Sequence, residues 1–225
     1  MTLPVIAIRP EPGCSATAAA GRAIGLTVEC HPLFAIQPLE WDAPDPSSVG
    51  ALLVGSANAF RHGGAGLAAF AGKPAHVVGE ATAQAARQVG FTVASVGTGG
   101  LQDVVRRLPP GTSLLRLAGE EHVPLDLPPG VTMVTRIVYH SRHLPMQVPL
   151  AWSIGKGAVV LLHSAVAAEW FAEECDRLSV PRGSIRLAAL GPRIAVAAGE
   201  GWAACTSADV PRDGALLALA REMCQ

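Results

Sequence analysis

The chain carries one sequence pattern twice, and this repeat limits the folds that it can adopt. Residues 77–86 begin Val-Val-Gly-Glu-Ala-Thr, residues 189–198 begin Ala-Leu-Gly-Pro-Arg-Ile, and alanine-rich sequence follows in both. Upstream of each segment, an apolar run ends in a serine-alanine pair, at Ser56 and at Ser164. The shared order of strand, serine turn, helix, strand, glycine turn and helix predicts two related α/β halves. We expect the halves to face each other, with the working site in the space between them.

The middle of the chain alternates between apolar runs and helical patterns. The predicted strands are residues 51–54, 75–78, 92–94, 113–117 and 132–138. The predicted helices are residues 57–70, 81–89 and 101–108. Such alternation predicts a parallel sheet with helices on its faces. Three prolines between residues 121 and 130 make any helix in that connection short or absent.

Each end of the chain supplies only part of a sheet. Residues 5–8 and 27–30 are predicted strands on either side of a helix capped by Ser15, and two strands are too few for a stable sheet. The C-terminal part resumes the alternation. Its predicted strands are residues 158–162, 185–190 and 203–206, and its predicted helices are residues 165–178, 193–199 and 213–222. The two ends are therefore expected to complete one domain, with the middle of the chain inserted as another.

The predicted fold class is α/β, with two similar domains, each a parallel β-sheet flanked by helices. Residues 1–33 and 145–225 form the discontinuous first domain, and residues 40–134 form the inserted second domain. Residues 34–39 and 135–144 are extended, and we expect them to form a two-stranded β linker that acts as a hinge.

Composition excludes several classes of protein. A net charge of −1 and a pI of about 6.6 argue against nucleic-acid binding, so an anionic ligand would need local groups to hold it. No apolar run is long enough to span a bilayer without a charge or proline, and no signal peptide is recognised. The five cysteines include no C-x-x-C pair, which favours unpaired thiols over disulfides or a metal cluster. We expect a soluble, cytoplasmic monomer.

Small residues follow several predicted strands, where the next helix begins. Unpaired backbone N–H groups and the positive end of the helix dipole can hold a carboxylate or phosphate at such turns. In open α/β sheets, ligands bind at these carboxyl ends of the strands. The candidate substrate-binding residues at the turns are Ser56, Ala57, Asn58, Gly79, Thr82, Ser164 and Gly191. The same residues could instead serve only as helix caps.

Three arginines and one tyrosine complete the candidate site. Arg9, Arg116 and Arg193 lie near strand ends or turns, where a guanidinium could pair with a substrate carboxylate or remain a surface charge. Tyr139 is the only tyrosine of the chain and lies in the predicted second linker. Its phenol could donate a proton or a hydrogen bond to a departing hydroxyl group, or it could anchor the hinge.

Common cofactor and nucleophile motifs are missing from the sequence. Residues 64–69 match the loose dinucleotide-binding pattern, but they fall within a predicted helix rather than a strand-to-helix turn. No Walker phosphate loop occurs, and neither Ser56 nor Ser164 lies in a nucleophile elbow. His140 and His143 have no nearby metal-ligating partners, so we interpret them as part of a solvated linker and expect no metal.

Taken in order, short segments of the chain resemble the uroporphyrinogen-III synthase family over nearly its whole length. These segments are residues 8–13, 56–59, 78–83, 90–91, 115–116, 138–139, 162–164 and 190–192. The resemblance implies two α/β domains, the first built from both chain ends, and a two-stranded linker. It implies cyclisation of the linear tetrapyrrole hydroxymethylbilane to uroporphyrinogen III, with loss of water and inversion of ring D. It also implies that no cofactor is needed and that hydroxymethylbilane synthase acts upstream.

The resemblance further implies how the residues divide the work. In the family, ionisation of the hydroxymethyl group gives an azafulvene, and the pyrrole supplies the electrons. The substrate also cyclises unaided to the wrong isomer, so the protein must hold the one conformer that leads to a spiro intermediate. Tyr139 matches the family tyrosine proposed to assist hydroxyl departure, and Ser56, Thr82 and Ser164 match polar cleft residues.

Two departures from the family pattern leave alternatives open. Ile194 replaces a hydroxyl residue that is common in the second glycine turn, and residues 117–119 read Leu-Ala-Gly where Arg-Gly is common. The first departure favours the alternative of a non-catalytic tetrapyrrole- or anion-binding two-domain protein. A nucleotide-dependent Rossmann-type enzyme is a third possibility, for which the sequence offers no phosphate loop.

Overall fold

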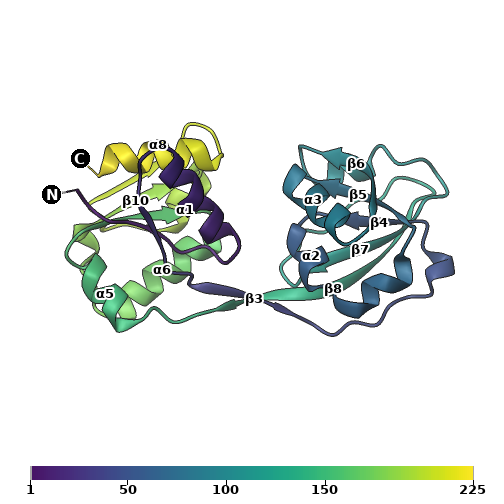
Figure 1. The fold of residues 1–225 in the computed structure, drawn as a ribbon, viewed down its shortest axis with the longest axis horizontal. Helices are drawn as coiled ribbons and strands as arrows, with labels where there is room; N and C mark the ends of the chain where they lie inside the picture. The colour runs from purple at the N-terminus through teal and green to yellow at the C-terminus, as the bar shows by residue number, and fades with distance from the viewer. Residues whose placement is uncertain (1, 225) are drawn as a thin grey trace. The chain divides into compact units, whose positions relative to one another are not determined.

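A computed structural model describes residues 2–224 of the chain, which divide into two compact units (Figure 1). Unit 1 takes the chain up to Ala35 and from Arg142 onward, and unit 2 takes Ile36–Ser141. Both units are α/β, with parallel sheets and helices on their faces, as the alternation of the sequence predicted. Unit 1 therefore joins the two ends of the chain, whereas unit 2 is one uninterrupted segment.

The sheet of unit 1 is parallel throughout. Its strands are β1 (Val5–Ala7), β2 (Val28–Cys30), β9 (Ala158–Leu162), β10 (Ile185–Ala189) and β11 (Ala204–Ser207). Their order across the sheet is β11-β10-β9-β1-β2, and each neighbouring pair is parallel. All five residues of the central strand β9 are buried, as expected for a parallel strand that is covered on both faces.

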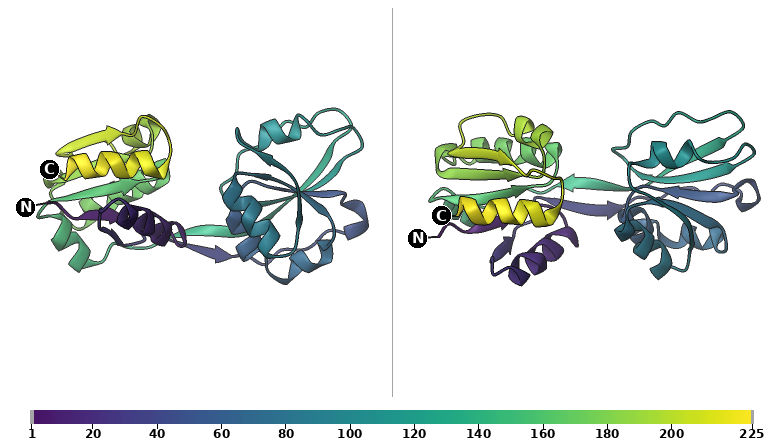
Figure 2. Two further views of the ribbon diagram at one scale, coloured as in Figure 1. Left: turned by 45° about the horizontal axis from the view of Figure 1, so that its top comes forward. Right: turned by 90° about the horizontal axis from the view of Figure 1, so that it is seen from above.

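Helices cover both faces of this sheet (Figure 2). One face carries α5 (Val148–Ile154), α6 (Ala165–Arg177) and α7 (Pro192–Ala197). The other face carries the two terminal helices, α1 (Gly13–Ala23) and α8 (Asp213–Met223). The first and last helices of the chain therefore share one hydrophobic core.

Unit 2 contains a six-stranded sheet. Its strands are β3 (Phe34–Pro38), β4 (Ala51–Val54), β5 (Pro74–Val78), β6 (Thr92–Gly97), β7 (Ser113–Gly119) and β8 (Thr132–His143). Their order is β3-β8-β7-β4-β5-β6, and the pairs from β8 to β6 are parallel. One face is covered by α2 (Ala57–His62), a 3-10 segment (Gly64–Phe70) and α3 (Glu80–Gln88), and the other by α4 (Leu101–Val105). Further short 3-10 turns lie at Pro46–Ser48 and Arg182–Ser184.

The two sheets have the same arrangement of parallel strands, but the strands follow one another along the chain in circularly permuted order. Strands β2-β1-β9-β10-β11 of unit 1 correspond in order to β8-β7-β4-β5-β6 of unit 2. On this correspondence α6, α7 and α8 match α2, α3 and α4. The helix α1, which joins β1 to β2, has no counterpart, because no helix occurs among the described residues between β7 and β8. The prolines of that segment predicted a short helix or none.

Several element boundaries differ from those that the sequence pattern predicted. The predicted helix over residues 57–70 is interrupted at Gly63, and Gly64 adopts a φ of 62°, which favours glycine. Helix α1 begins at Gly13, so Ser15 lies in its first turn rather than at its cap. Strand β8 runs without a break through Tyr139, which pairs with Gly119, so part of the predicted second linker belongs to the sheet.

Among residues 2–224, no helix combines the length and the hydropathy needed to cross a bilayer.

Candidate active site in unit 2

Unit 2 contains a cavity of about 560 Å³, a volume typical of small-molecule sites. It lies where β4, β5 and β7 end, which is the edge of a parallel sheet at which ligands bind. Three of the residues predicted from the sequence line it together: Ser56, Arg116 and Tyr139. The remaining lining residues are Gly55, Val78, Gly100, Leu101, Gln102, Leu117, Ala118, Gly119, Glu121, His122, Val123, Pro124 and Leu125.

Arg116 is the buried charge of this cavity. It lies on β7 between Leu115 and Leu117, which face the opposite side of the sheet, and only 5% of its surface is exposed. Its Nε is buried without a hydrogen-bond partner, and no carboxylate among residues 2–224 forms an ion pair with it. Burial lowers the pKa of the guanidinium from its usual value, but a group of this kind keeps its charge at neutral pH. Arg116 thus places a charged side chain, without a hydrogen bond at Nε, in the wall of the cavity.

Tyr139 lies on β8 beside the end of β7. Its ring is half-buried and rests against Gly119, its partner in the strand register. A Cβ atom added to Gly119 would lie 2.7 Å from the Tyr139 ring and 2.9 Å from its hydroxyl oxygen. The phenol hydroxyl forms no hydrogen bond within the part of the chain that the structure describes, residues 2–224. The absence of a side chain at Gly119 thus provides the space that the Tyr139 ring occupies.

No helix joins β7 to β8 in the described chain, so a helix does not cover this side of the cavity. Residues 121–125 form part of its wall instead, and Leu125 packs against the core beneath α4. Two hydrogen bonds of 2.9 Å join Gln102 and Asp126, which fastens the segment to α4. His122 donates from Nδ1 towards the carbonyl oxygens of Gly119 (3.0 Å) and Glu120 (3.1 Å). The wall is therefore held at both of its ends.

In unit 1, the position equivalent to Arg116 is covered. Arg116 pairs with Leu53, three residues before Ser56, and Ala7 pairs with Leu161, three residues before Ser164. Ala7 therefore stands where Arg116 stands in unit 2. There, the first turn of α1 closes over the strand end, and the Cys14 thiol donates to the Ala7 carbonyl oxygen at 3.2 Å. The cavity of unit 2 occupies the place that this helix fills in unit 1.

The other predicted residues of unit 2, which are Ala57, Asn58, Gly79 and Thr82, do not line the cavity. Ser56 lines the cavity, and its Oγ also accepts a hydrogen bond from Asn58 N at 3.3 Å, which caps α2. Ala57 is buried at the start of that helix. Gly79 caps α3 with a φ of 77°, and its N–H donates a hydrogen bond to the Gly97 carbonyl oxygen. Thr82 is 4% exposed and lies in the first turn of α3.

The predicted residues of unit 1 lie at the equivalent edge of its own sheet. Ser164 caps α6 by accepting from Ala167 N at 3.2 Å. Gly191 caps α7, and Arg193 is exposed on that helix. Ile194 packs against the unit 1 core, so the side chain that replaces a hydroxyl here serves packing.

Arg9 belongs to a polar network around Asp213. Its Nη1 lies 3.2 Å from both carboxylate oxygens of Asp213. Thr17 Oγ1 donates to the same carboxylate at 2.8 Å, and His163 Nε2 does so at 3.1 Å. The hydrogen bond from His163 is the largest cause that lowers the pKa of Asp213 to about 2, with help from Thr17 and the charge of Arg9 and against the effect of burial. This network links α8 to the ends of β1 and β9. The Arg9 guanidinium is therefore already paired with Asp213.

The low pKa of Asp213 predicts acid sensitivity in unit 1. Because folding lowers this pKa from 3.8 to about 2, the ionised group adds stability that is complete above pH 4 and lost as the pH falls through 2. Asp213→Asn should therefore unfold more easily than the unaltered chain at pH 7, and the difference should close between pH 4 and pH 2. Urea titrations followed by tryptophan fluorescence would measure it, since Trp152, Trp170 and Trp202 all lie in unit 1. A difference that stays constant with pH would contradict this role.

Sequence reasoning missed part of the cavity. Gly119, His122 and Gln102 were not predicted as site residues, and all three line it. The available signal was the proline-broken segment after β7, which marked a change at the pocket rim without identifying these side chains. The described residues that could together hold a metal ion lie elsewhere, in unit 1.

Comparisons with known proteins agree on one family. A family model described as uroporphyrinogen-III synthase HemD matches residues 15–218. The fold is similar to that of uroporphyrinogen-III synthetase from Helicobacter pylori, with a TM-score of 0.68 and 16% identity over 98% of this chain and 99% of that chain. A mutant uroporphyrinogen III synthase from the extremely thermophilic bacterium Thermus thermophilus matches with a TM-score of 0.50 and 17% identity over 96% of both chains. No curated protein sequence matches the chain significantly.

Proposed function

Since the chain belongs to the uroporphyrinogen-III synthase family, the enzymes that cyclise hydroxymethylbilane to uroporphyrinogen III, we propose that the unit 2 cavity binds one part of that substrate and positions its hydroxymethyl group. The observation that carries this proposal is the buried, unpartnered guanidinium of Arg116. A buried charge without a counter-ion costs several kcal/mol, and a ligand carboxylate offsets that cost. The substrate carries acetate and propionate carboxylates that fit the role.

Tyr139 is the group we assign to hydroxyl departure. Its phenol faces the same cavity as Arg116 and forms no hydrogen bond to residues 2–224 that would have to break first. The phenol transfers its proton to the hydroxyl oxygen, which leaves as water, while the pyrrole nitrogen supplies electrons to form the exocyclic double bond. The proton that ring D releases at the end of ring closure restores the phenol. The azafulvene so formed is attacked by the substituted carbon of ring D, which gives the spiro intermediate and then the inverted ring.

Positioning decides the product. Hydroxymethylbilane closes without help to the isomer that lacks the inversion, so the protein must favour one folded conformer over others. Ser56 and Arg116, on neighbouring strand ends, fix one side of the substrate relative to Tyr139. At its own sheet edge, unit 1 offers further polar groups of the same kind, Ser164, Gly191 and Arg193, as candidates for other carboxylates.

The function is tested by identifying the product isomer. Purified protein mixed with freshly prepared hydroxymethylbilane should give the type III isomer faster than the spontaneous reaction gives type I. Separation of the oxidised products by chromatography distinguishes the two. Type I product alone, at the spontaneous rate, would reject catalysis, and binding of the tetrapyrrole in that case would favour the non-catalytic alternative.

We further propose that the protein works as a cytoplasmic monomer and receives its substrate from hydroxymethylbilane synthase. Its near-neutral net charge of −1 supports a role without nucleic-acid partners. The reactivity of the substrate supports short transfer between the two enzymes, since any delay yields the unwanted isomer. Light scattering on the purified protein would detect an oligomer.

A further inference from the structure

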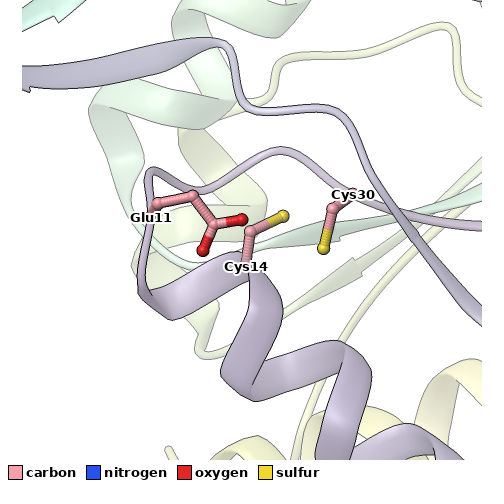
Figure 3. A group of neighbouring side chains, drawn as sticks. All are labelled: Glu11, Cys14 and Cys30. Carbon is pink, nitrogen blue, oxygen red and sulfur yellow. The ribbon is translucent and has the colours of Figure 1, made fainter.

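Two of the five cysteines come together in unit 1, beside a carboxylate (Figure 3). Cys14 lies in the first turn of α1, Cys30 ends β2, and Glu11 lies in the turn that leads into α1. One ligand atom from each residue, the two sulfurs and a carboxylate oxygen, lies within 4.8 Å of the other two. The two cysteines are 16 positions apart in the chain, so no short motif reveals the group in the sequence.

We propose that Glu11, Cys14 and Cys30 bind a thiophilic divalent cation such as Zn²⁺. Two thiolates and one carboxylate are donors that zinc accepts, and the sulfur pair disfavours Mg²⁺ and Ca²⁺. In a tetrahedral zinc site, the donor atoms lie about 3.5–3.8 Å apart, as follows from metal–ligand distances of about 2.0–2.3 Å. The three donors lie within 4.8 Å of one another, and because Cys30 is half-buried and Glu11 is exposed, we expect these two side chains to move inward when a cation binds.

The surroundings of the three donors suit a bound cation. Ser15 donates to both carboxylate oxygens of Glu11, from its backbone N at 3.1 Å and its hydroxyl at 2.8 Å. Such outer contacts orient a ligating carboxylate. Cys14 is fully buried, and its thiol donates to the Ala7 carbonyl oxygen at 3.2 Å. A bound cation would replace this proton, and the Ala7 oxygen would keep the hydrogen bond that it accepts from His31 N at 2.9 Å. Three protein donors leave the fourth position to water, on the exposed side formed by Glu11.

A cation here would fasten the start of α1 to the end of β2. Strand β2 has three residues and lies at the edge of the unit 1 sheet, with only β1 as its neighbour. A link between the edge strand and the helix that precedes it would stabilise this part of unit 1. None of the three proposed ligands lines the unit 2 cavity.

The site is tested with reduced, chelator-treated, full-length protein. Addition of Co²⁺ should produce thiolate-to-cobalt charge-transfer absorption that saturates at one equivalent, and Zn²⁺ should abolish the band. Zn²⁺ should also raise the melting temperature, while Mg²⁺ should not. These effects should disappear in Cys30→Ser and weaken at least tenfold in Glu11→Gln, whose exposed side chain can be changed without disturbing the core.

Cys205→Ser is the matched control, because Cys205 is an exposed cysteine outside the group. It should bind Co²⁺ as the unaltered chain does. The proposal is overturned if no thiolate band forms, if the band persists in Cys30→Ser, or if air-oxidised protein contains a Cys14–Cys30 disulfide while the reduced protein binds no cation. Loss of binding in Cys14→Ser would be accepted only with a circular dichroism spectrum that matches the unaltered chain, because Cys14 is in the core.

Discussion

Tyr139→Phe is expected to slow ring closure to uroporphyrinogen III about 100-fold or more, with little change in affinity for the macrocycle. The substitution removes only the phenol oxygen, which faces the cavity and forms no hydrogen bond within residues 2–224. Packing of the ring against Gly119 is retained, so the fold should not suffer. A positioned proton donor typically contributes about 10²–10⁴-fold to a rate. Single-turnover kinetics with hydroxymethylbilane, beside equilibrium binding of the product, would separate the two quantities.

A second variant tests whether the place of the phenol matters. Gly119→Ala adds a Cβ atom at 2.7 Å from the Tyr139 ring, too close for the ring to stay where it is. Turnover should fall although every polar group of the cavity is still present. Equal losses in turnover and affinity for Tyr139→Phe would instead assign the tyrosine a role in anchoring the hinge.

Arg116→Met is expected to weaken substrate binding about 10- to 100-fold while leaving the protein as stable as before, or more stable. Charge-assisted hydrogen bonds contribute about 1.5–3 kcal/mol, which corresponds to this range of affinity. In the free protein, the same guanidinium is 5% exposed with Nε unpartnered, so removing it relieves a desolvation cost. A residue kept for stability would show the opposite pattern. Binding is measured by product titration, and stability by thermal unfolding.

Arg136→Met serves as the matched control on the same sheet. Arg136 already donates to the carbonyl oxygens of Asp42 at 2.7 Å and Thr135 at 3.1 Å, and it does not line the cavity. It should leave binding unchanged. Arg116→Lys should recover part of the affinity, because an ammonium carries the charge without the planar fork that grips a carboxylate. If Arg116→Met bound product normally and unfolded at a lower temperature, the anion-binding role would be wrong.

The architecture could be predicted because apolar runs and small-residue turns alternate so regularly. The repeat identified β4 with β9 and β5 with β10, and the observed strand orders match at those positions. Helix α5 escaped prediction, since Pro149 near its start resembles a helix breaker although a proline in the first turn needs no N–H partner. Elsewhere the observed ends of helices differ from the predicted ones because of local backbone geometry. At Gly64, for example, a positive φ interrupts the helix that was predicted over residues 57–70.

The site was predictable in its residue types and not in its environment. Ser56, Arg116 and Tyr139 were candidates from their positions, but only the structure shows that they line one cavity. On strand β7, the alternation of faces places Arg116 away from Leu115 and Leu117, without showing whether a helix covers that face. Because the described residues between β7 and β8 form no helix, Arg116 lines a cavity instead of packing beneath a helix. Only the structure could show this.

The interrupted path of the chain through unit 1 also affects the order in which the protein matures on the ribosome. Strand β1 emerges early, yet its neighbour β9 is translated only after the whole of unit 2. Because domains generally fold as units during synthesis, the inserted segment can complete its sheet while the N-terminal residues still await their partners. Strand β1 and helix α1 are thus the part of this polypeptide that waits longest for its native neighbours.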